Sequence, residues 1–280
     1  MAQQFPRGDL KPGSKPVAIV VPVYNSKFTT DEEISLRHLT HFLGANDKFL
    51  VVPQSLNINL QGFQVRRFPD EFFFDTATYS ALLLSSNFYR TFAEYRYILI
   101  YQLDALVFSD QLSSWCETGL DYIGAPWLAD AGLDFIETTT VGNGGFSLRR
   151  TESFVKITES PGFDKELVKY RDVFDAAKPV HKRILNVPRK LARWVLGRNK
   201  RLSASGSDDP GERLNEDCFW SFRAKKYFPE FRIGSVSEAL RFSFEVAPRQ
   251  CYELNSRQLP FGCHAWTKYD REFWEPFLLK

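Results

Sequence analysis

Short runs of apolar, largely β-branched residues recur through the first half of the chain, and they constrain its fold more than any other feature. Residues 17–24 form a continuous run of this kind, and residues 48–53 and 97–101 form two more. Such runs are typical of strands that are buried on both faces of a parallel sheet. Each is strand-sized and far shorter than the roughly 18 apolar residues that a membrane-spanning helix needs.

Amphipathic helical patterns separate these runs. Residues 31–44 carry acids in the first turn, apolar residues at helical spacing and Gly44 at the exit, and residues 76–94 repeat the helical spacing. Residues 63–68 and 121–125 are two further short strands by their composition. Strands that alternate with helices predict right-handed βαβ units, and therefore an α/β fold with a mostly parallel central sheet flanked by helices.

The alternation ends near residue 125. A glycine-rich loop at 142–145 leads into what we expect to be a strand. Helical patterns follow at 152–158, 165–177 and 215–226, and a flexible connector is expected at 203–211. We find no internal repeat, so a solenoid or propeller is excluded.

Composition indicates an ordinary globular protein. Of the 280 residues, 44% are hydrophobic and 25% are charged, which excludes a disordered or fibrous chain. We expect residues 1–16 to be a disordered lead-in and residues 17–280 to be one domain with two halves, 17–125 and 126–280. The lead-in lacks the apolar segment of a signal peptide, and the four cysteines lack CxxC spacing, so we expect a cytoplasmic protein with reduced thiols.

The segment 178–201 is strongly basic. It holds nine of the chain's 36 Lys and Arg residues and no acid, with Trp194 and several aliphatic residues among the cations. This mixture is typical of a segment that lies on an anionic membrane or binds an acidic glycan, so the protein is expected to be peripheral on the inner face of a membrane. No nucleic-acid-binding motif accompanies the cations, and we expect no nucleic acid partner.

Two features mark the first candidate site. Asp104 follows the strand 97–101 and is flanked by apolar residues. It fits a ligand of a Mg²⁺ or Mn²⁺ ion chelated by a nucleotide diphosphate, or a cap of the next turn. The glycines at 142–145 fit a close approach of the backbone to another group, or a turn with positive φ. Their spacing is neither GxGxxG nor a Walker loop, which excludes those nucleotide sites.

Two later motifs carry ionisable groups. Glu216 and Asp217 fall in the first turn of a predicted helix, where they either cap the helix or provide a general base. Neighbouring residues face different ways on a helix, so only one of them can serve as the base. His264 is either a metal ligand beside a carboxylate or a histidine packed against Trp266. Cys263 has no partner pair at ligand spacing, which argues against zinc.

Aromatic residues are abundant, with 26 Phe, 11 Tyr and 6 Trp. Most of them must belong to the core. Trp127 and Trp266 occur in loop contexts, where an indole either packs in the core or stacks on a sugar or base, and the sequence leaves both roles open.

In this order, the motifs resemble those of GT-A glycosyltransferases. The longer strings 97–105, 122–127, 142–149 and 259–266 resemble a family catalogued only as a domain of unknown function. The resemblance covers about residues 17–275, and it implies a GT-A-like, Rossmann-like fold with an acceptor-side C-terminal portion.

The resemblance implies a nucleotide-sugar donor, with a UDP-sugar favoured, held at the carboxyl edge of the sheet by residues of the half 17–125. Asp104 matches the last Asp of the Asp-x-Asp motif and His264 the late metal-ligand histidine, for Mn²⁺ or Mg²⁺. Gln102 stands where the first Asp is expected and brings no charge, so the ion is weakly held or absent. The donor contacts implied are Pro22, Tyr24, Asn25, Gln102, Asp104, Gly144 and Gly145.

The half 126–280 is then the acceptor and catalytic half. Asp217 matches the base of inverting members, with Glu216 as the alternative, and the acceptor is a hydroxyl of a glycan or lipid-linked saccharide. Two other hypotheses remain. One is a degenerate GT-A scaffold that binds a glycan or a membrane, which Gln102 favours. The other is a nucleotidyltransferase, which usually needs a basic, glycine-rich loop directly after the first strand. At that position this chain has Tyr-Asn-Ser-Lys (residues 24–27), which disfavours this hypothesis.

Overall fold

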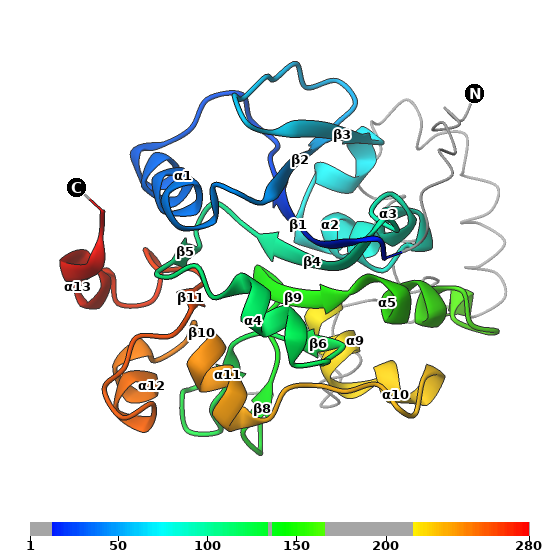
Figure 1. The fold of residues 1–280 in the computed structure, drawn as a ribbon. Coiled ribbons are helices and arrows are strands. Elements are labelled where there is room, and N and C mark those ends of the chain that lie inside the picture. The colour runs from blue at the N-terminus through cyan, green and yellow to red at the C-terminus, as the bar shows by residue number, and fades with distance from the viewer. Residues whose placement is uncertain (1–12, 134–135, 166–214, 280) are drawn as a thin grey trace, which may run out of the picture.

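The computed structural model describes residues 13–133, 136–165 and 215–279. Its centre is a six-stranded sheet in the order β3-β2-β1-β4-β9-β6 (Figure 1). Strands β1, β2, β3 and β4 run parallel, while β9 is antiparallel to both β4 and β6, so the sheet is mostly parallel as predicted. The strands are β1 (Lys15–Pro22), β2 (Asp47–Pro53), β3 (Gln64–Phe68), β4 (Tyr95–Tyr101), β6 (Tyr122–Ile123) and β9 (Phe146–Arg150).

Side chains of the central strands alternate between two cores, one on each face of the sheet. In β1, Ala18 and Val20 pack in one core, and Val17, Ile19 and Val21 pack in the other. Burial on both faces explains why this strand is a continuous apolar run. The first core is covered by α2 (Thr76–Leu83), α3 (Ser86–Arg90), α5 (Thr151–Thr158) and α9 (Glu216–Phe222), and the second by α1 (Thr30–Leu43) and α4 (Leu112–Glu117).

Two predicted helices are each divided in the structure. The pattern at 76–94 becomes α2 and α3, because the Ser85 hydroxyl accepts a hydrogen bond from the Phe88 N–H and starts a new helix. The pattern at 215–226 becomes α9 and α10 (Ala224–Tyr227), which meet at the non-helical Arg223. Residues 166–177 of the predicted helix 165–177, the basic segment 178–201 and the connector 203–211 lie outside the described residues, as do residues 1–12 of the expected lead-in 1–16. The strand that we expected from residue 17 begins at Lys15.

The C-terminal part of the chain returns to the carboxyl end of β4. Strands β5 (Leu106–Val107), β10 (Ser243–Phe244) and β11 (Gly262–Cys263) form a small three-stranded sheet next to that end (Figure 1). Around it lie α11 (Val236–Phe242), α12 (Pro248–Leu254), α13 (Arg271–Trp274) and the 3-10 turn η4 (Glu275–Phe277). This arrangement brings the segment that contains His264 to the end of the central sheet.

Three smaller elements complete the surroundings of that sheet edge. The 3-10 turn η1 (Asp70–Phe73) precedes α2, and strands β7 (Pro126–Trp127) and β8 (Thr140–Val141) pair antiparallel just before the glycine loop. All four cysteines are free and buried. In the part of the chain that the structure describes, no helix has the length and apolar character to cross a membrane.

Candidate active site

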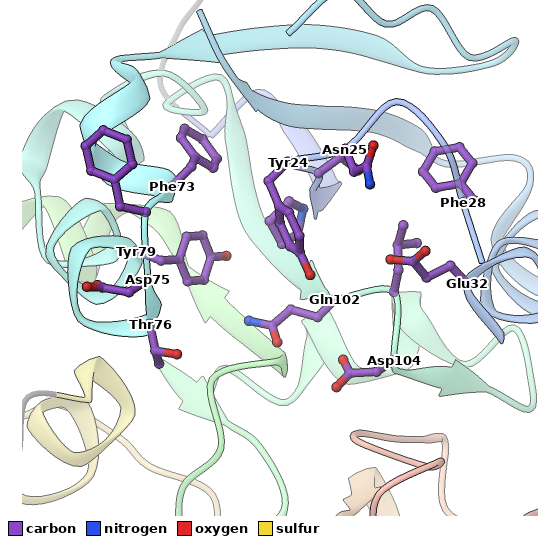
Figure 2. A pocket seen from close by; sticks show the side chains of 14 residues that line it. Tyr24, Asn25, Phe28, Glu32, Phe73, Asp75, Thr76, Tyr79, Gln102 and Asp104 are labelled. Atoms are coloured by element: carbon purple, nitrogen blue, oxygen red, sulfur yellow. The ribbon is translucent and has the colours of Figure 1, made fainter. Parts of the chain in front are cut away.

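A cavity of about 520 Å³ opens at the carboxyl ends of β1 and β4. In Figure 2, Tyr24 lies between Tyr79 on one side and Glu32 on the other, and Gln102 and Asp104 lie below them. Ligands of open α/β sheets bind in this location. The predicted donor residues in the lining are Pro22, Tyr24, Asn25, Gln102 and Asp104, and the lining is completed by Val23, Phe28, Glu32, Phe73, Phe74, Asp75, Thr76, Tyr79 and Leu103.

His264 lies against Asp104 and Gln102 at the edge of this cavity. Its Nε2 atom is 3.1 Å from Oδ1 of Asp104 and 3.1 Å from Oε1 of Gln102, although 162 positions separate Gln102 and His264 in the chain. The other ring nitrogen, Nδ1, is 3.0 Å from Oε1 of Glu245. The imidazole therefore has an oxygen-rich environment on both sides, and it is not merely packed against Trp266.

The two carboxylates control the charge of this imidazole. Burial alone disfavours the charged form, but Asp104 and Glu245 raise the pKa of His264 to about 10. In return, and against the effect of burial, His264 holds the pKa values of both carboxyl groups below their usual range. The Asp104 side chain is 47% exposed and faces the cavity, so its burial is less complete than the flanking apolar residues suggested.

The donor atoms at the cavity edge fit a divalent cation that also binds a diphosphate. Within the described ranges, no group of three or more His, Cys, Asp and Glu side chains has the arrangement of a metal site. Mg²⁺, however, is commonly held by one or two carboxylates and substrate phosphates. Asp104, the amide oxygen of Gln102 and Nε2 of His264 would form such a partial set once a cation displaced the Nε2 proton, because only an unprotonated ring nitrogen is a ligand. Glu245 on Nδ1 matches the carboxylate that orients metal-bound histidines.

The glycine loop lies against both His264 and α9. A Cβ on Gly145 would fall 2.0 Å from Nε2 of His264, and one on Gly144 would fall 2.1 Å from Oε1 of Glu216. Gly144 and Gly145 therefore allow the side chains of Glu216 and His264 to approach the loop backbone closely, which is the first of the two reasons predicted for these glycines. In the segment 142–145, the residue with positive φ is Asn143 (φ 68°). The Asn143 amide nitrogen is 3.0 Å from Nδ1 of His264.

Glu216 and Asp217 face different ways, as the helical spacing predicts. Glu216 is buried, and its two carboxylate oxygens pair with the guanidinium of Arg149 at 2.8 and 3.0 Å. Asp217 accepts hydrogen bonds from the N–H of Gly144 at 3.2 Å and of Cys218 at 2.9 Å. Both oxygens of Glu216 are held by a buried guanidinium, whereas Asp217 accepts only two backbone N–H groups and is partly exposed, so Asp217 is the better placed of the two to accept a proton from a ligand.

The environment of Asp217 favours its neutral form. Burial is the largest cause and the nearby carboxylates of Glu216 and Glu245 add to it, which raises the pKa of Asp217 to about 7. A carboxyl group with a pKa near neutrality is suited to proton transfer.

The glycine loop contacts both Asp217 and His264, although Gly144, Gly145, Asp217 and His264 are not among the residues that line the cavity. Within the loop, Gly144 contacts Asp217, Asn143 contacts His264, and the carbonyl of Gly145 accepts a hydrogen bond from the N–H of Gln102.

Three residues of the site had no predicted role, although two of them, Asn143 and Arg149, lie within the string 142–149. Glu245 and Asn143 contact His264, and Arg149 contacts Glu216. Arg149 had no signal, because it stands beside Arg150 at the end of a short strand, where two adjacent arginines are ordinarily exposed. Glu245 also had none, because it follows residues 241–244, Arg-Phe-Ser-Phe, and belongs to no recognised motif. The two tryptophans left open are both core residues: Trp266 is fully buried, and Trp127 is 4% exposed and stacked on Phe222.

The family described as "Protein of unknown function (DUF5672)" matches residues 62–264. The chain belongs to this family. The matched range includes Gln102, Asp104, the glycine loop, Asp217 and His264, but not the first strand. No curated protein matches the chain.

Several solved glycosyltransferase structures are similar to this chain. The galactosyltransferase LgtC, solved with donor and acceptor sugar analogues, has a TM-score of 0.50 and 11% identity over 94% of this chain and 96% of its own. GlyE of Streptococcus pneumoniae TIGR4 has a TM-score of 0.47 and 11% identity over 95% of this chain, which spans 61% of GlyE. A glycosyltransferase that glycosylates the major capsid of PBCV-1 has a TM-score of 0.46 and 9% identity, over 94% and 98% of the two chains. The chain accordingly has a GT-A-like fold.

Proposed function

We propose that this protein is a glycosyltransferase that moves a sugar from a nucleotide-sugar donor, with a UDP-sugar favoured, to a hydroxyl of a glycan or lipid-linked saccharide. One observation carries the proposal. Nε2 of His264 lies 3.1 Å from Oδ1 of Asp104 and 3.1 Å from Oε1 of Gln102, beside a cavity of about 520 Å³ at the carboxyl edge of a GT-A-like sheet. The reactive end of a nucleoside diphosphate sugar requires such a combination of open volume and ligands for a phosphate-bound cation.

The cavity provides contacts for each part of the donor. Tyr24 is 72% exposed and presents a ring on which a base can stack. Asn25 and the hydroxyl of Tyr79 are hydrogen-bonding groups on opposite sides of the same space (Figure 2). In this proposal they orient the nucleoside, and the diphosphate extends toward Asp104.

Asp104, Gln102 and His264 would hold a Mn²⁺ or Mg²⁺ ion, with Glu245 orienting the imidazole. When bound, such an ion supplies positive charge that stabilises the departing diphosphate. Gln102 would contribute an amide dipole without a charge, so the protein ligands alone would hold the ion weakly, and the donor phosphates would supply further negative charge.

Asp217 is the proposed general base. Its carboxylate takes the proton of the acceptor hydroxyl, which is a poor nucleophile until that proton is removed. Attack from the side opposite to the leaving diphosphate inverts the anomeric carbon. The N–H of Gly144 holds Oδ2 of Asp217 and the N–H of Cys218 holds Oδ1, which fixes the plane of the carboxylate.

Thermal unfolding and hydrolysis test this function. The protein is titrated with UDP-, GDP- and dTDP-sugars in the presence of Mn²⁺ or Mg²⁺, and release of the nucleoside diphosphate is followed. We expect one nucleotide sugar to raise the unfolding temperature in a metal-dependent way, and we expect Asp104→Ala to abolish that response. Absence of any response to all three, in both the wild type and the Asp104→Ala variant, would rule out the proposed function.

The acceptor proposal includes contact of the basic segment 178–201 with an anionic membrane, which supports a lipid-linked acceptor. We propose this contact because the segment has nine cationic residues and no acid, and such segments are attracted to anionic lipids. Sedimentation with anionic and with neutral vesicles tests it. We expect binding to anionic vesicles only, lost when residues 178–201 are deleted, and equal binding to both vesicle types would contradict the proposal.

Gln102 supports a second candidate, a GT-A scaffold that binds a donor or glycan without turnover, because the ion site has one carboxylate fewer than the Asp-x-Asp pattern. That candidate predicts a thermal shift with UDP but no release of UDP from any UDP-sugar. Under the main proposal the wild type releases UDP, and Gln102→Asp tightens Mn²⁺ binding by adding a charge.

A further inference from the structure

Arg149 is a fully buried charge on β9, the strand between β4 and the edge strand β6 of the central sheet. It lies on β9, in register with Ile98 of β4 and Tyr122 of β6, and its side chain is 0% exposed. Its guanidinium lies 5.8 Å from the ring centre of Tyr122 and 5.6 Å from that of Phe154. A buried cation is costly unless it is paired and hydrogen-bonded, so the surroundings of this group carry information.

Every N–H of this guanidinium has an acceptor. Nε donates to the hydroxyl of Ser147 at 3.0 Å. One terminal nitrogen donates to the hydroxyl of Tyr89 and to Oε2 of Glu216, both at 3.0 Å. The other donates to Oε1 of Glu216 at 2.8 Å and to the carbonyl of Gly144 at 3.3 Å. A guanidinium has five donors, and all five are used here.

The contacts connect strand β9 to the two parts of the site that hold Asp217. The carbonyl of Gly144 belongs to the glycine loop, and the N–H of the same residue holds Oδ2 of Asp217. Glu216 immediately precedes Asp217 in the first turn of α9. Arg149 therefore fixes the loop on one side of Asp217 and the helix on the other.

Stability alone does not account for such a pair. Buried ion pairs lose so much hydration that apolar side chains of similar size are often as stabilising. The bidentate geometry does define the relative position of its two partners. We propose that Arg149 and Glu216 are a positioning pair that sets the position and the charge of Asp217, an inference that rests on the function proposed above.

The main test replaces the pair by apolar residues, Arg149→Met with Glu216→Leu. The groups left behind keep partners, because Ser147 still donates to the carbonyl of Gly144, and the hydroxyl of Tyr89 still donates to the carbonyl of Leu83. The double variant should therefore fold. The nucleotide sugar hydrolysed by the wild type serves as the probe, and kcat and KM are measured from release of the nucleoside diphosphate.

We expect kcat to fall about tenfold or more, since small misplacements of a catalytic group cost rate steeply. The donor KM should stay within about threefold, because the donor site is unchanged. A purely structural role would instead lower the unfolding temperature and the amount of active protein, without this split between kcat and KM.

Glu216→Gln provides a second measurement that does not depend on the double variant. It removes one of the negative charges that raise the pKa of Asp217 and leaves the Arg149 charge, which lowers it. The acid limb of the pH–rate profile should therefore move to lower pH. Arg149→Lys keeps the positive charge but loses the bidentate geometry of the guanidinium. It should lower kcat without moving the acid limb of the pH–rate profile to lower pH.

A matched control is the exposed ion pair between Arg90 of α3 and Glu159 after α5. Replacing both by Gln should leave kcat and KM unchanged within about twofold, because exposed pairs contribute little.

The inference is overturned if the folded double variant keeps the wild-type kcat and Glu216→Gln keeps the wild-type pH profile. That result leaves the proposed function intact, provided that Asp217→Asn still abolishes turnover. If the wild type hydrolyses no nucleotide sugar, or if Asp217→Asn is fully active, the proposed function itself is wrong.

Discussion

Asp217 combines two properties at the scale of one residue: a fixed carboxylate plane and a pKa raised to about 7. A base must be deprotonated to act, so turnover should rise as the pH is raised through about 7 and level off above it. Asp217→Asn cannot accept the proton, and we expect it to lower kcat by roughly 10²-fold or more, the range for removal of a general base. Measuring kcat from pH 5 to 9 for both proteins checks this.

The same carboxyl group should destabilise the folded protein at neutral pH. Its pKa is higher in the folded state than the ordinary 3.8, so between about pH 4 and 7 the folded state binds more protons than the unfolded state. Stability contributed by this group is therefore lost as the pH rises through that window. Relative to the wild type, Asp217→Asn should gain stability from pH 4 to pH 7, and a pH-independent difference in unfolding free energy would contradict the assignment.

At the scale of elements, the glycine loop acts as a spacer between β9, α9 and the segment that carries His264. A side chain at 145 has no room while the imidazole is present, because its Cβ would lie 2.0 Å from Nε2 of His264. Gly145→Ala should therefore destabilise the fold by about 1–3 kcal/mol, the usual cost of overpacking.

A double-mutant cycle separates this steric conflict from other effects. In a His264→Ala background the three atoms nearest to the added Cβ are gone, so the cost of Gly145→Ala should shrink. Thermal unfolding of the four proteins gives the coupling. Additive effects would mean that the loop relaxes without touching His264.

At the scale of the whole molecule, buried His38 attaches the C-terminal segment to α1. Its Nδ1 is 2.9 Å from the carbonyl of Val107, so this nitrogen carries the proton, and its Nε2 accepts the N–H of Leu279 at 2.9 Å. The contact with Leu279 requires the neutral ring, because a protonated Nε2 cannot accept a hydrogen bond. Outside it, Asp31 of α1 pairs with Arg271 of α13 at 2.9 Å.

The contribution of His38 to the stability of the folded protein should decrease in acid. Burial lowers the pKa of His38, with smaller contributions from His41 and Arg37, so below about pH 6.5 the unfolded state takes up a proton that the folded state does not. Stability from this group is lost as the pH falls below that value. His38→Gln should flatten the decline in unfolding free energy between pH 6.5 and 5, and an unchanged slope would show that His38 does not titrate on unfolding.

The sheet was predictable because its signals are local. The runs at 17–24, 48–53 and 97–101 record burial on both faces of a strand, and the helical patterns between them require right-handed parallel connections. The division of 76–94 into two helices was missed, because a Ser85 cap competes with helix continuation only in its tertiary context.

The site was predictable in part. Asp104 and residues 22–25 follow strands, and parallel strands end at one edge, so their presence in a common cavity follows from the pattern. Glu245 and Arg149 were not foreseen, since nothing next to them in the chain indicates a buried partner more than a dozen residues away.

By itself, the sequence determined the layered α/β architecture and the residue types available at the sheet edge, because hydrophobic periodicity and strand-end chemistry depend on neighbours in the chain. Only the tertiary structure decided that His264 meets Asp104, that Glu216 turns inward to Arg149, and that Asp217 is left facing the loop. Those outcomes depend on how far each strand and helix is shifted against the next, and close packing fixes these shifts for the whole molecule at once.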